Sequence, residues 1–211
     1  VFVDALNAAG DSNPQAQNAS GEKFVIAGKD FELQFQSLRW TSGRDDEDNN
    51  GLWDKCGDTK MNEAPNSDYA RVPTWNMGEP NATLRKPAGG IDGNLTYKNG
   101  NVSFDQGKYQ ANATNVTYEE VGIIQIQKNS ITNFMGKRVK SCSPYIGRFV
   151  PDHFNTTIDY HGSLNETCSN SFTYIGQNMT YGYANEPQLS IEAQNTANNT
   201  TNNYNGTFVH L

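Results

Sequence analysis

Charged side chains are scarce in this sequence. They make up only 18% of its 211 residues, and the polarity of the chain comes mainly from Asn, Thr, Ser, Gln and Gly. Long helices usually carry many Glu, Lys, Arg, Ala and Leu residues, so this composition argues against a helical protein. Aromatic residues still reach 11%, which argues against disorder, because disordered chains lack large side chains to bury. The composition therefore indicates strands that are joined by polar turns.

Long hydrophobic runs and an excess of positive charge are also missing. No apolar run approaches the roughly 20 residues that span a bilayer, so membrane insertion is not expected. The formal net charge of −7 disfavours nucleic acid and anionic membrane surfaces as partners, because binding them needs clustered Lys and Arg. The chain opens on the strand-like Val1-Phe2-Val3-Asp4 without a signal peptide. We therefore expect a mature or excised fragment of a longer protein.

Cysteine is scarce and odd in number, with Cys56, Cys142 and Cys168. None of the three lies in a Cys-x-x-Cys pair, and no histidine joins them at the spacing of zinc ligands. In an oxidising compartment two cysteines pair, and the third stays free or bridges to sequence outside this chain. The sequence does not select the pair, although a bond between Cys142 and Cys168 would staple a proposed domain junction.

Alternating apolar and polar residues predict the first clear strand. From Phe31 to Trp40 apolar and polar residues alternate, which places Phe31, Leu33 and Phe35 on one face. Leu38 and Trp40 break the parity, which indicates a bulge or the end of the ladder. Further along the chain, Val121 to Gln127 is expected to form a buried strand.

The segment from Asn94 to Phe104 predicts a β-hairpin. Its Asn99-Gly100 dipeptide supplies the positive φ angles that a type I′ turn requires. The runs on both sides of this dipeptide are therefore expected to pair with each other.

The end of the chain carries a second strand-like region. Arg148 to Val150 runs into Pro151, which cannot donate to a ladder and so marks the end or the edge of a strand. Three further runs resemble strands: Phe154 to Tyr160, Ser171 to Ile175, and Gln188 to Ala193. Residues 194–211 are dominated by Asn and Thr, apart from an ending in Gly206-Thr207-Phe208-Val209.

The predicted fold class is all-β. We expect an immunoglobulin-like β-sandwich in residues 1–147, followed in residues 148–211 by a second β-sandwich segment that is partial or packed on the first. No segment shows sustained helical periodicity.

An acidic loop carries the sharpest chemical signal. Asp46, Asp48, Asn50 and Asp54 occupy positions 1, 3, 5 and 9 of a loop whose sixth residue is Gly51. Ca²⁺ takes six to eight oxygen ligands, alternate side chains of a tight loop point inward, and glycine permits the sharp turn. The loop is therefore predicted to bind calcium in a structural role.

The loop is not an EF-hand. The twelfth position, where an EF-hand has a bidentate Glu, is Gly57, so Asp58 or a distant carboxylate would have to complete the shell. The alternative is an acidic, solvated turn that binds no ion.

Sequons are about three times as frequent as chance predicts. They indicate either a heavily N-glycosylated surface protein or an Asn/Thr-rich surface whose composition inflates their number. Both interpretations favour the cell exterior. The asparagines are Asn18, Asn81, Asn94, Asn101, Asn112, Asn115, Asn155, Asn165, Asn178, Asn198, Asn199 and Asn205.

Two places carry residue types that catalysis uses. Asp152 and His153 are adjacent, but adjacent strand residues point to opposite faces, so His153 is interpreted as a turn or core-edge residue. Glu119 and Glu120 precede a predicted strand, where a capping or hydrogen-bonding role is favoured over acid catalysis. The sequence has no phosphate loop, metal-hydrolase motif or nucleophile elbow, and we predict that the chain is not an enzyme.

Aromatic residues offer a possible platform for sugars. Trp40 is assigned to the core, whereas Trp53 and Trp75 lie in polar surroundings and are predicted to form an exposed pair that binds a ligand by stacking.

Several segments together resemble a known bacterial family. They include Tyr118-Glu119-Glu120-Val121-Gly122, the run from Ile146 to Phe154, Pro87-Ala88-Gly89-Gly90, Phe172 to Gln177, and Asn202 to Phe208. With the acidic loop, they resemble in order the domain of unknown function found in MshQ, a protein of the mannose-sensitive haemagglutinin type IV pilus locus. The Gly-Arg-Phe-Val-Pro-Asp-His-Phe run is the most specific of these segments.

The resemblance implies a large secreted protein that is associated with the biogenesis or the tip of a pilus. It implies no catalytic residues. This chain departs from the pattern in its many sequons and in Cys142, just before the Gly-Arg-Phe run.

The function expected from these observations is that of an extracellular structural or adhesive module in a pilus-associated surface protein, stabilised by calcium. Its partners would be other surface or pilus subunits and host or surface glycans. The alternative is a carbohydrate-binding module that uses exposed aromatics.

Calcium titration tests the acidic loop. Ca²⁺ added to chelator-treated protein is expected to give saturable heat in a calorimeter and a higher melting temperature, because an ion that binds only the folded state stabilises it. Asp48→Ala should abolish both effects. An unchanged melting temperature and no heat would assign the loop to a solvated turn.

Overall fold

A computed structural model of the 211-residue chain describes residues 1–37, 74–126, 143–165 and 173–209. Within these ranges the regular secondary structure is β, apart from a 3₁₀ turn, η3 (Gly206–Phe208). The predicted all-β class is confirmed. Cys56, Cys142 and Cys168 all lie outside the described residues.

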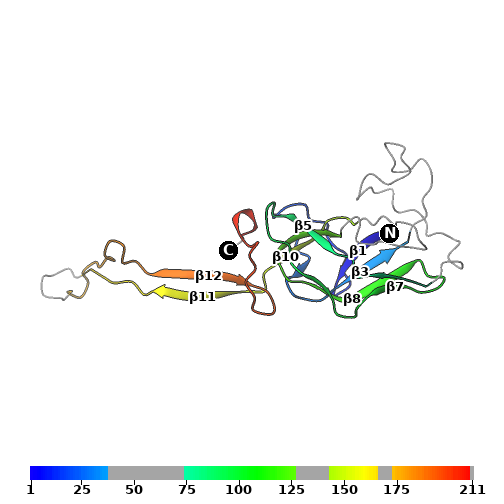
Figure 1. The fold of residues 1–211 in the computed structure, drawn as a ribbon. Coiled ribbons are helices and arrows are strands. Elements are labelled where there is room, and N and C mark those ends of the chain that lie inside the picture. Colours follow the sequence, from blue (N-terminus) through cyan, green and yellow to red (C-terminus); the bar gives the residue numbers. More distant parts are fainter. Residues whose placement is uncertain (38–73, 127–142, 166–172, 210–211) are drawn as a thin grey trace.

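Four antiparallel strands form the first sheet, in the order β1-β3-β8-β6 (Figure 1). Their bounds are β1 (Phe2–Asn7), β3 (Phe31–Gln36), β8 (Gln110–Tyr118) and β6 (Leu95–Tyr97). Phe31, Leu33 and Phe35 are all buried and alternate with half-buried polar residues. The predicted face of this strand is therefore confirmed.

The second sheet has the order β2-β10-β9-β5. Its strands are β2 (Val25–Ile26), β10 (Ile146–Val150), β9 (Gly122–Ile126) and β5 (Ala82–Lys86). The short strand β2 pairs in parallel with β10, and the other pairs are antiparallel. A separate two-stranded sheet pairs β4 (Trp75–Gly78) with β7 (Val102–Phe104).

An aromatic cluster joins the two four-stranded sheets. Phe149 of the second sheet lies 5.0 Å from Tyr118 and 5.4 Å from Phe31 of the first sheet, measured between ring centroids. Phe24, just before β2, completes the cluster at 5.9 Å from Phe149. The sheets therefore face each other across one core and form a sandwich.

The other face of the second sheet is covered as well. Ile123 and Val121 pack there with Ala16, Ala19 and Phe208, from the start and the end of the chain. Successive side chains of a strand point to opposite faces. Ile123 therefore packs on this outer face, whereas Ile124 packs in the core between the two sheets. Burial on both faces explains the nearly unbroken apolar run that predicted this strand.

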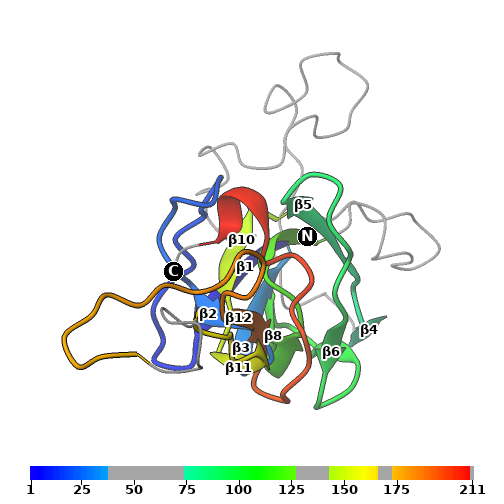
Figure 2. The ribbon, with the colours of Figure 1, turned by 90° about the vertical axis from the view of Figure 1, so that its left-hand side faces the viewer.

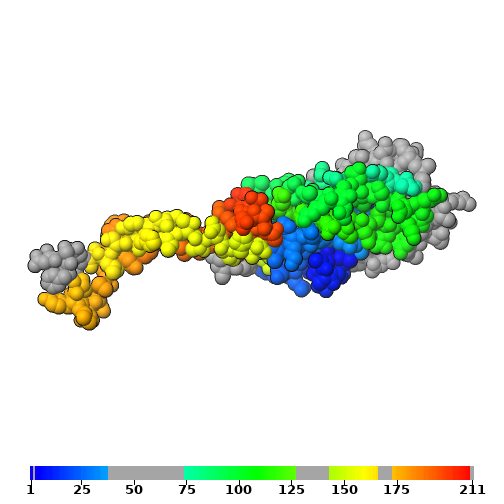
Figure 3. All heavy atoms as spheres, turned by 90° about the horizontal axis from the view of Figure 1, so that it is seen from below, coloured from blue at the N-terminus to red at the C-terminus, as the bar shows by residue number. Residues whose placement is uncertain are grey.

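Beyond β10 the chain forms an antiparallel pair, β11 (His153–Tyr160) and β12 (Gln188–Gln194), which we call the ribbon. The ribbon leads away from the sandwich as a slender extension (Figures 1 and 3). Seen from the ribbon end, β11 and β12 lie in front of the strands of the sandwich (Figure 2).

The tail that follows β12 returns to the sandwich and is held there by Glu120. This buried carboxylate accepts backbone N–H groups from Asn202 at 2.9 Å and Asn203 at 3.1 Å. It also accepts the N–H of Val121 at 2.8 Å. A buried carboxylate requires such donors, because it has lost its water.

The Asn203 side chain makes a second set of tail contacts. Its amide nitrogen donates to the carbonyl oxygens of Ile91 at 2.8 Å and Val121 at 3.1 Å. Its amide oxygen accepts the N–H of Ile91 at 2.8 Å. A Cβ atom at Gly90 would lie 2.6 Å from that oxygen, so only glycine fits there. We call these contacts of Glu120 and Asn203 the tail clamp.

The base of the ribbon is fixed by backbone contacts. Asp152 N–H donates to the Gln194 carbonyl at 2.8 Å, and Thr196 N–H donates to the Ala27 carbonyl at 3.1 Å. Because the tail clamp holds the chain after β12 and β10 holds it before β11, both ends of the ribbon are anchored.

The predicted hairpin at Asn99-Gly100 is wrong. β6 pairs with β8 and β7 pairs with β4, so the two runs belong to different sheets. Gly100 has a positive φ of 75°, but Asn99 does not, and a type I′ turn requires both. The Gly100 N–H donates instead to the Tyr97 carbonyl at 3.1 Å, which makes Gly100 the last residue of the turn.

The strand predicted from Ser171 to Ile175 is not seen in its described part. Residues 173–175 are irregular, and the turn that follows contains Gly176 with a φ of 85°. Gly206 to Phe208 is the 3₁₀ turn that carries the buried Phe208. The predicted boundary between residues 147 and 148 falls within β10, whose pairing with β9 and β2 continues to Val150. The described residues 151–165 and 173–209 supply the ribbon and the returning tail.

Substitution of Asn203 tests the tail clamp. Asn203→Ala should lower the free energy of unfolding by about 2–4 kcal/mol, because the buried Val121 carbonyl and the partly buried N–H and carbonyl groups of Ile91 lose these partners. The control is Asn81→Ala, since that side chain is exposed and lies outside the tail clamp; its loss should cost less than about 0.5 kcal/mol. Urea denaturation measures both values. Equal losses would contradict a role for the Asn203 side chain.

Candidate functional site

The two faces of the ribbon differ in chemistry. The register pairs Ile158 with Leu189, Thr156 with Ile191, and Phe154 with Ala193. Residues paired across strands share a face, so these side chains form an apolar face. The opposite face carries polar pairs, such as Asn155 with Glu192 and Thr157 with Ser190.

The apolar face is open to solvent. Ile158 is 54% exposed, Leu189 55% and Ile191 49%. Only the base is covered, where Ala193 is buried and the Phe154 ring lies 5.5 Å from that of Tyr204. A row of exposed aliphatic side chains on a projecting element is typical of an interaction surface.

The part of the chain that contains the ribbon has no Lys or Arg. Residues 149–211 have five acidic residues and neither of these basic ones, so they carry −5 of the net charge of −7. The described acidic residues are Asp152, Asp159, Glu186 and Glu192. The ribbon is therefore both apolar and acidic.

Aromatic side chains gather toward the far end of the ribbon. Tyr183 is 99% exposed and Tyr174 is 66% exposed, and Tyr181 is nearly half exposed. The Gly182 N–H donates to the Ser163 carbonyl at 3.1 Å, and this bond holds the returning chain in place.

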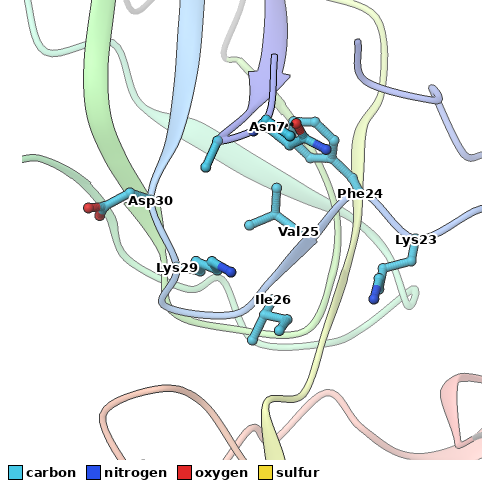
Figure 4. Close-up of a pocket in the computed structure, with 9 residues that line it drawn as sticks. Asn7, Lys23, Phe24, Val25, Ile26, Lys29 and Asp30 are labelled. Carbon is cyan, nitrogen blue, oxygen red and sulfur yellow. Dashed lines mark hydrogen bonds between the residues drawn. The ribbon is translucent and has the colours of Figure 1, made fainter. Parts of the chain in front are cut away.

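A cavity of about 390 Å³ opens on the sandwich beside β2. Figure 4 shows Val25 near its centre, with Lys23 and Lys29 on opposite sides and Ile26 below. Ala8, Ala9 and Phe24 add to its apolar lining. We call this cavity the β2 pocket.

Asp30 also lines the β2 pocket, but its carboxylate is engaged elsewhere. It forms an ion pair with Lys98, and Figure 4 shows it pointing away from Val25. No ion pair of the described residues engages Lys23 or Lys29, and both side chains are exposed. The pocket therefore combines apolar walls with positive charge.

The predicted calcium ligands lie outside the described residues. These are Asp46, Asp48, Asn50 and Asp54, and the same holds for Trp53. Among the described residues, no three His, Cys, Asp or Glu side chains form a group that could hold a metal ion. The calcium site stays a prediction.

Trp75 lies at the start of β4 and not in a polar loop. It is half-buried, and its ring stacks on Phe104 with centroids 5.5 Å apart and planes at 11°. Much of its surface is therefore committed to packing. Sequence reasoning missed β4, because only four residues form it.

All twelve sequon asparagines are exposed in the structure. Within the described ranges, the buried asparagines are Asn13, Asn195 and Asn203, and none of them belongs to a sequon. Exposure of the asparagine is a condition for N-glycosylation, and every sequon meets it. Asn155 lies on the polar face of the ribbon, so a glycan there would leave the apolar face open.

Asp152 and His153 are in contact, against the expectation from alternation. The carboxylate lies 2.8 Å from Nδ1 of the ring, because Asp152 sits in a bend before β11. Nε2 lies 3.1 Å from the Gln194 side-chain oxygen. Both ring nitrogens thus contact the ribbon base, and the pair helps to close the ribbon.

Glu119 and Glu120 take structural roles. Glu120 anchors the tail clamp, and the carbonyl of Glu119 accepts the Asn195 side-chain amide at 2.9 Å. The structural role predicted for this pair is therefore observed. Asn203 contacts both Glu120 and Gly90, and Gly147 packs against Gly122. These residues come from four of the segments on which the resemblance to the bacterial family rests.

Burial shifts the titration of two tyrosines. It raises the pKa of Tyr118, whose hydroxyl accepts the Gly93 N–H at 3.1 Å, and the charges of Glu120 and Asp92 add to this effect. Burial likewise raises the pKa of Tyr97, whose hydroxyl donates to the Pro80 carbonyl at 2.7 Å. Both hydroxyls are buried hydrogen-bonding groups of the core.

Sequence models of two DUF6701 domains match this chain. The second domain matches residues 3–117, and the third domain matches residues 120–211. No curated protein and no solved structure gives a significant match. The two segments meet beside Glu120, and β9 and β10 of the later segment share a sheet with β2 and β5 of the earlier one.

No helix of the described residues is long and apolar enough to cross a membrane.

Proposed function

This chain belongs to the DUF6701 family, and we propose that it is a structural or adhesive module of an extracellular surface protein. The observation that carries the proposal is the anchored ribbon with its open apolar face. A sandwich supplies a stiff frame, and the ribbon presents an interaction surface away from it.

Rigid anchoring supports a role in display. An isolated two-stranded hairpin is marginally stable in water, so a ribbon of this kind needs support at its ends. The tail clamp and β10 supply that support. An element held at both ends loses little entropy when it binds, which favours its use as a contact element.

The composition supports a position outside the cell. Every sequon asparagine is exposed, and the surface is rich in Asn and Thr. Association with a pilus is proposed from the resemblance carried by the Gly147 to Phe154 run. Stiffening by calcium is proposed from the ligand spacing between Asp46 and Asp54.

A non-enzymatic role agrees with the use of the candidate catalytic groups. Glu120 is occupied by three backbone donors, and both His153 nitrogens have protein partners. A reacting group would have to compete with those contacts.

Attachment of cells tests the adhesive role. Antibodies against the chain should label intact cells of the source organism, and cells with Ile158→Thr and Leu189→Thr should attach to surfaces less than the parent cells. Threonine keeps the strand propensity but removes apolar surface. The matched control is Ile91→Thr, at an isoleucine on the sandwich that is 60% exposed. Label that enters only permeabilised cells would contradict the proposal.

Carbohydrate binding is a second candidate, favoured by the exposed tyrosines of the far end. Tyrosine rings can stack on sugar faces. On a glycan array, the protein should bind a defined sugar, and Tyr183→Ala should weaken that binding. A further variant, Trp53→Ala, tests the exposed pair of Trp53 and Trp75 that was predicted from the sequence. Trp75→Ala is less informative, since it removes the stack on Phe104. An array without any bound sugar would reject this candidate.

A further inference from the structure

We propose that the base of the ribbon closes fully only while both nitrogens of the His153 ring carry a proton, so that pH controls its closure. The contacts that carry this inference form a chain of side chains from Asp152 through His153, Gln194 and Glu192 to Thr200, which we call the base network. The base network joins β11 and the bend before it to β12 and to the returning tail. The inference goes beyond the proposed function and does not rest on an adhesive role.

Glu192 fixes the direction of the hydrogen bonds in the base network. Its two carboxylate oxygens accept the Thr200 hydroxyl at 2.7 Å and the Gln194 side-chain amide at 3.1 Å. An ionised carboxylate only accepts hydrogen bonds, so Gln194 must turn its NH₂ group toward Glu192. The side-chain oxygen of Gln194 therefore faces the other way, toward the ring of His153.

Both ring nitrogens of His153 consequently face acceptors. Nε2 lies 3.1 Å from the Gln194 side-chain oxygen, and Nδ1 lies 2.8 Å from the Asp152 carboxylate. A neutral imidazole has one N–H donor and one bare nitrogen that only accepts, whereas the imidazolium ion has two donors. Only the charged ring can donate to both partners, so the closed base holds an imidazolium ion.

Loss of one ring proton removes part of the base network. The bare nitrogen would point its lone pair at an oxygen of Asp152 or of Gln194, and that contact would become repulsive. Gln194 can turn its NH₂ group toward the neutral ring, but it then loses its bond with Glu192. Each way of accommodating the neutral ring therefore costs at least one hydrogen bond of the base.

The charged groups that face the ring are acidic. Asp152 faces it directly from the bend before β11, and Glu192 faces it from β12 through Gln194. The tail contributes the Thr200 hydroxyl, which does not titrate in this range. Residues 149–211 contain no Lys or Arg, and no ion pair within the described ranges brings such a residue to Asp152 or Glu192. The protonated ring is thus the positive charge of the base network.

The direction of the pH dependence follows from the number of bound protons. The closed base requires a proton that the open base can release, so closure is favoured at low pH and weakens as the pH rises. Imidazole side chains change charge between about pH 5 and about pH 8. The side chains of His153 and Asp152 are 39% and 36% exposed, so water screens their attraction and the effect is modest.

Hydrogen–deuterium exchange at about pH 5.5 and about pH 8 tests the inference. The measured rates are divided by the intrinsic exchange rates of the unfolded chain at each pH, because exchange itself is faster at higher pH. The paired amides of β11 and β12 should then lose about three- to tenfold of their protection at the higher pH, while those of β3 and β8 change less.

Substitution of the two described histidines assigns the effect to one ring. His153→Gln should abolish the difference between the two pH values, because glutamine does not titrate. The matched control is His161→Gln, at an exposed histidine just beyond the end of β11, and this variant should keep the wild-type response.

Glu192→Gln tests the mechanism. A glutamine at position 192 can donate as well as accept, so Gln194 is free to turn its NH₂ group toward a neutral ring, and the pH response should shrink. A histidine that was only a packing element would give no such dependence on Glu192.

Three results would overturn the inference. The first is equal corrected protection of the ribbon amides at both pH values, and the second is a wild-type pH response in His153→Gln. The third is an undiminished pH response in Glu192→Gln, which also decides the matter if His153→Gln opens the ribbon at both pH values. None of these readouts involves cell attachment, so the proposed function stands or falls separately.

Discussion

The buried carboxylate of Glu120 is the constraint on which the architecture depends. It lies where β8 passes to β9 and accepts the backbone N–H groups of Val121, Asn202 and Asn203. A buried carboxylate without donors would be costly, so the tail must return to supply them. The return of the tail closes the excursion of the chain through β11 and β12. The ribbon is therefore a loop with two fixed ends and not a loose extension.

The anchored ribbon connects this architecture with function. A sandwich with two covered faces on its second sheet gives a stiff frame, and the ribbon is the element that leaves apolar surface uncovered. Its charge is purely acidic, whereas the β2 pocket combines apolar side chains with two lysines. The proposed role in adhesion follows from this division between frame and contact element.

Local patterns predicted the strands, but their partners lay beyond local information. Alternation at Phe31, Leu33 and Phe35 identified β3, and Pro151 marked the end of β10 correctly. Asn99-Gly100 failed as a hairpin signal because β6 and β7 pair with strands distant from that turn. The link between Glu120 and Asn203 spans 83 residues, and no pattern in the sequence joins them. The run from Phe154 to Tyr160 was identified as a strand, yet the sequence could not reveal that one face of β11 stays uncovered.

Hydrogen–deuterium exchange of the wild-type chain and Glu120→Gln tests the central claim, that the tail clamp holds the ribbon. Glutamine keeps one acceptor oxygen and loses the second, so the bonds to the Asn202 and Asn203 N–H groups cannot both be retained. In the wild type, we expect paired amides of β11 and β12 to exchange slowly. In the variant, those amides should exchange much faster while the amides of β3 and β8 stay protected. Equal exchange of the ribbon amides in both proteins would contradict the account.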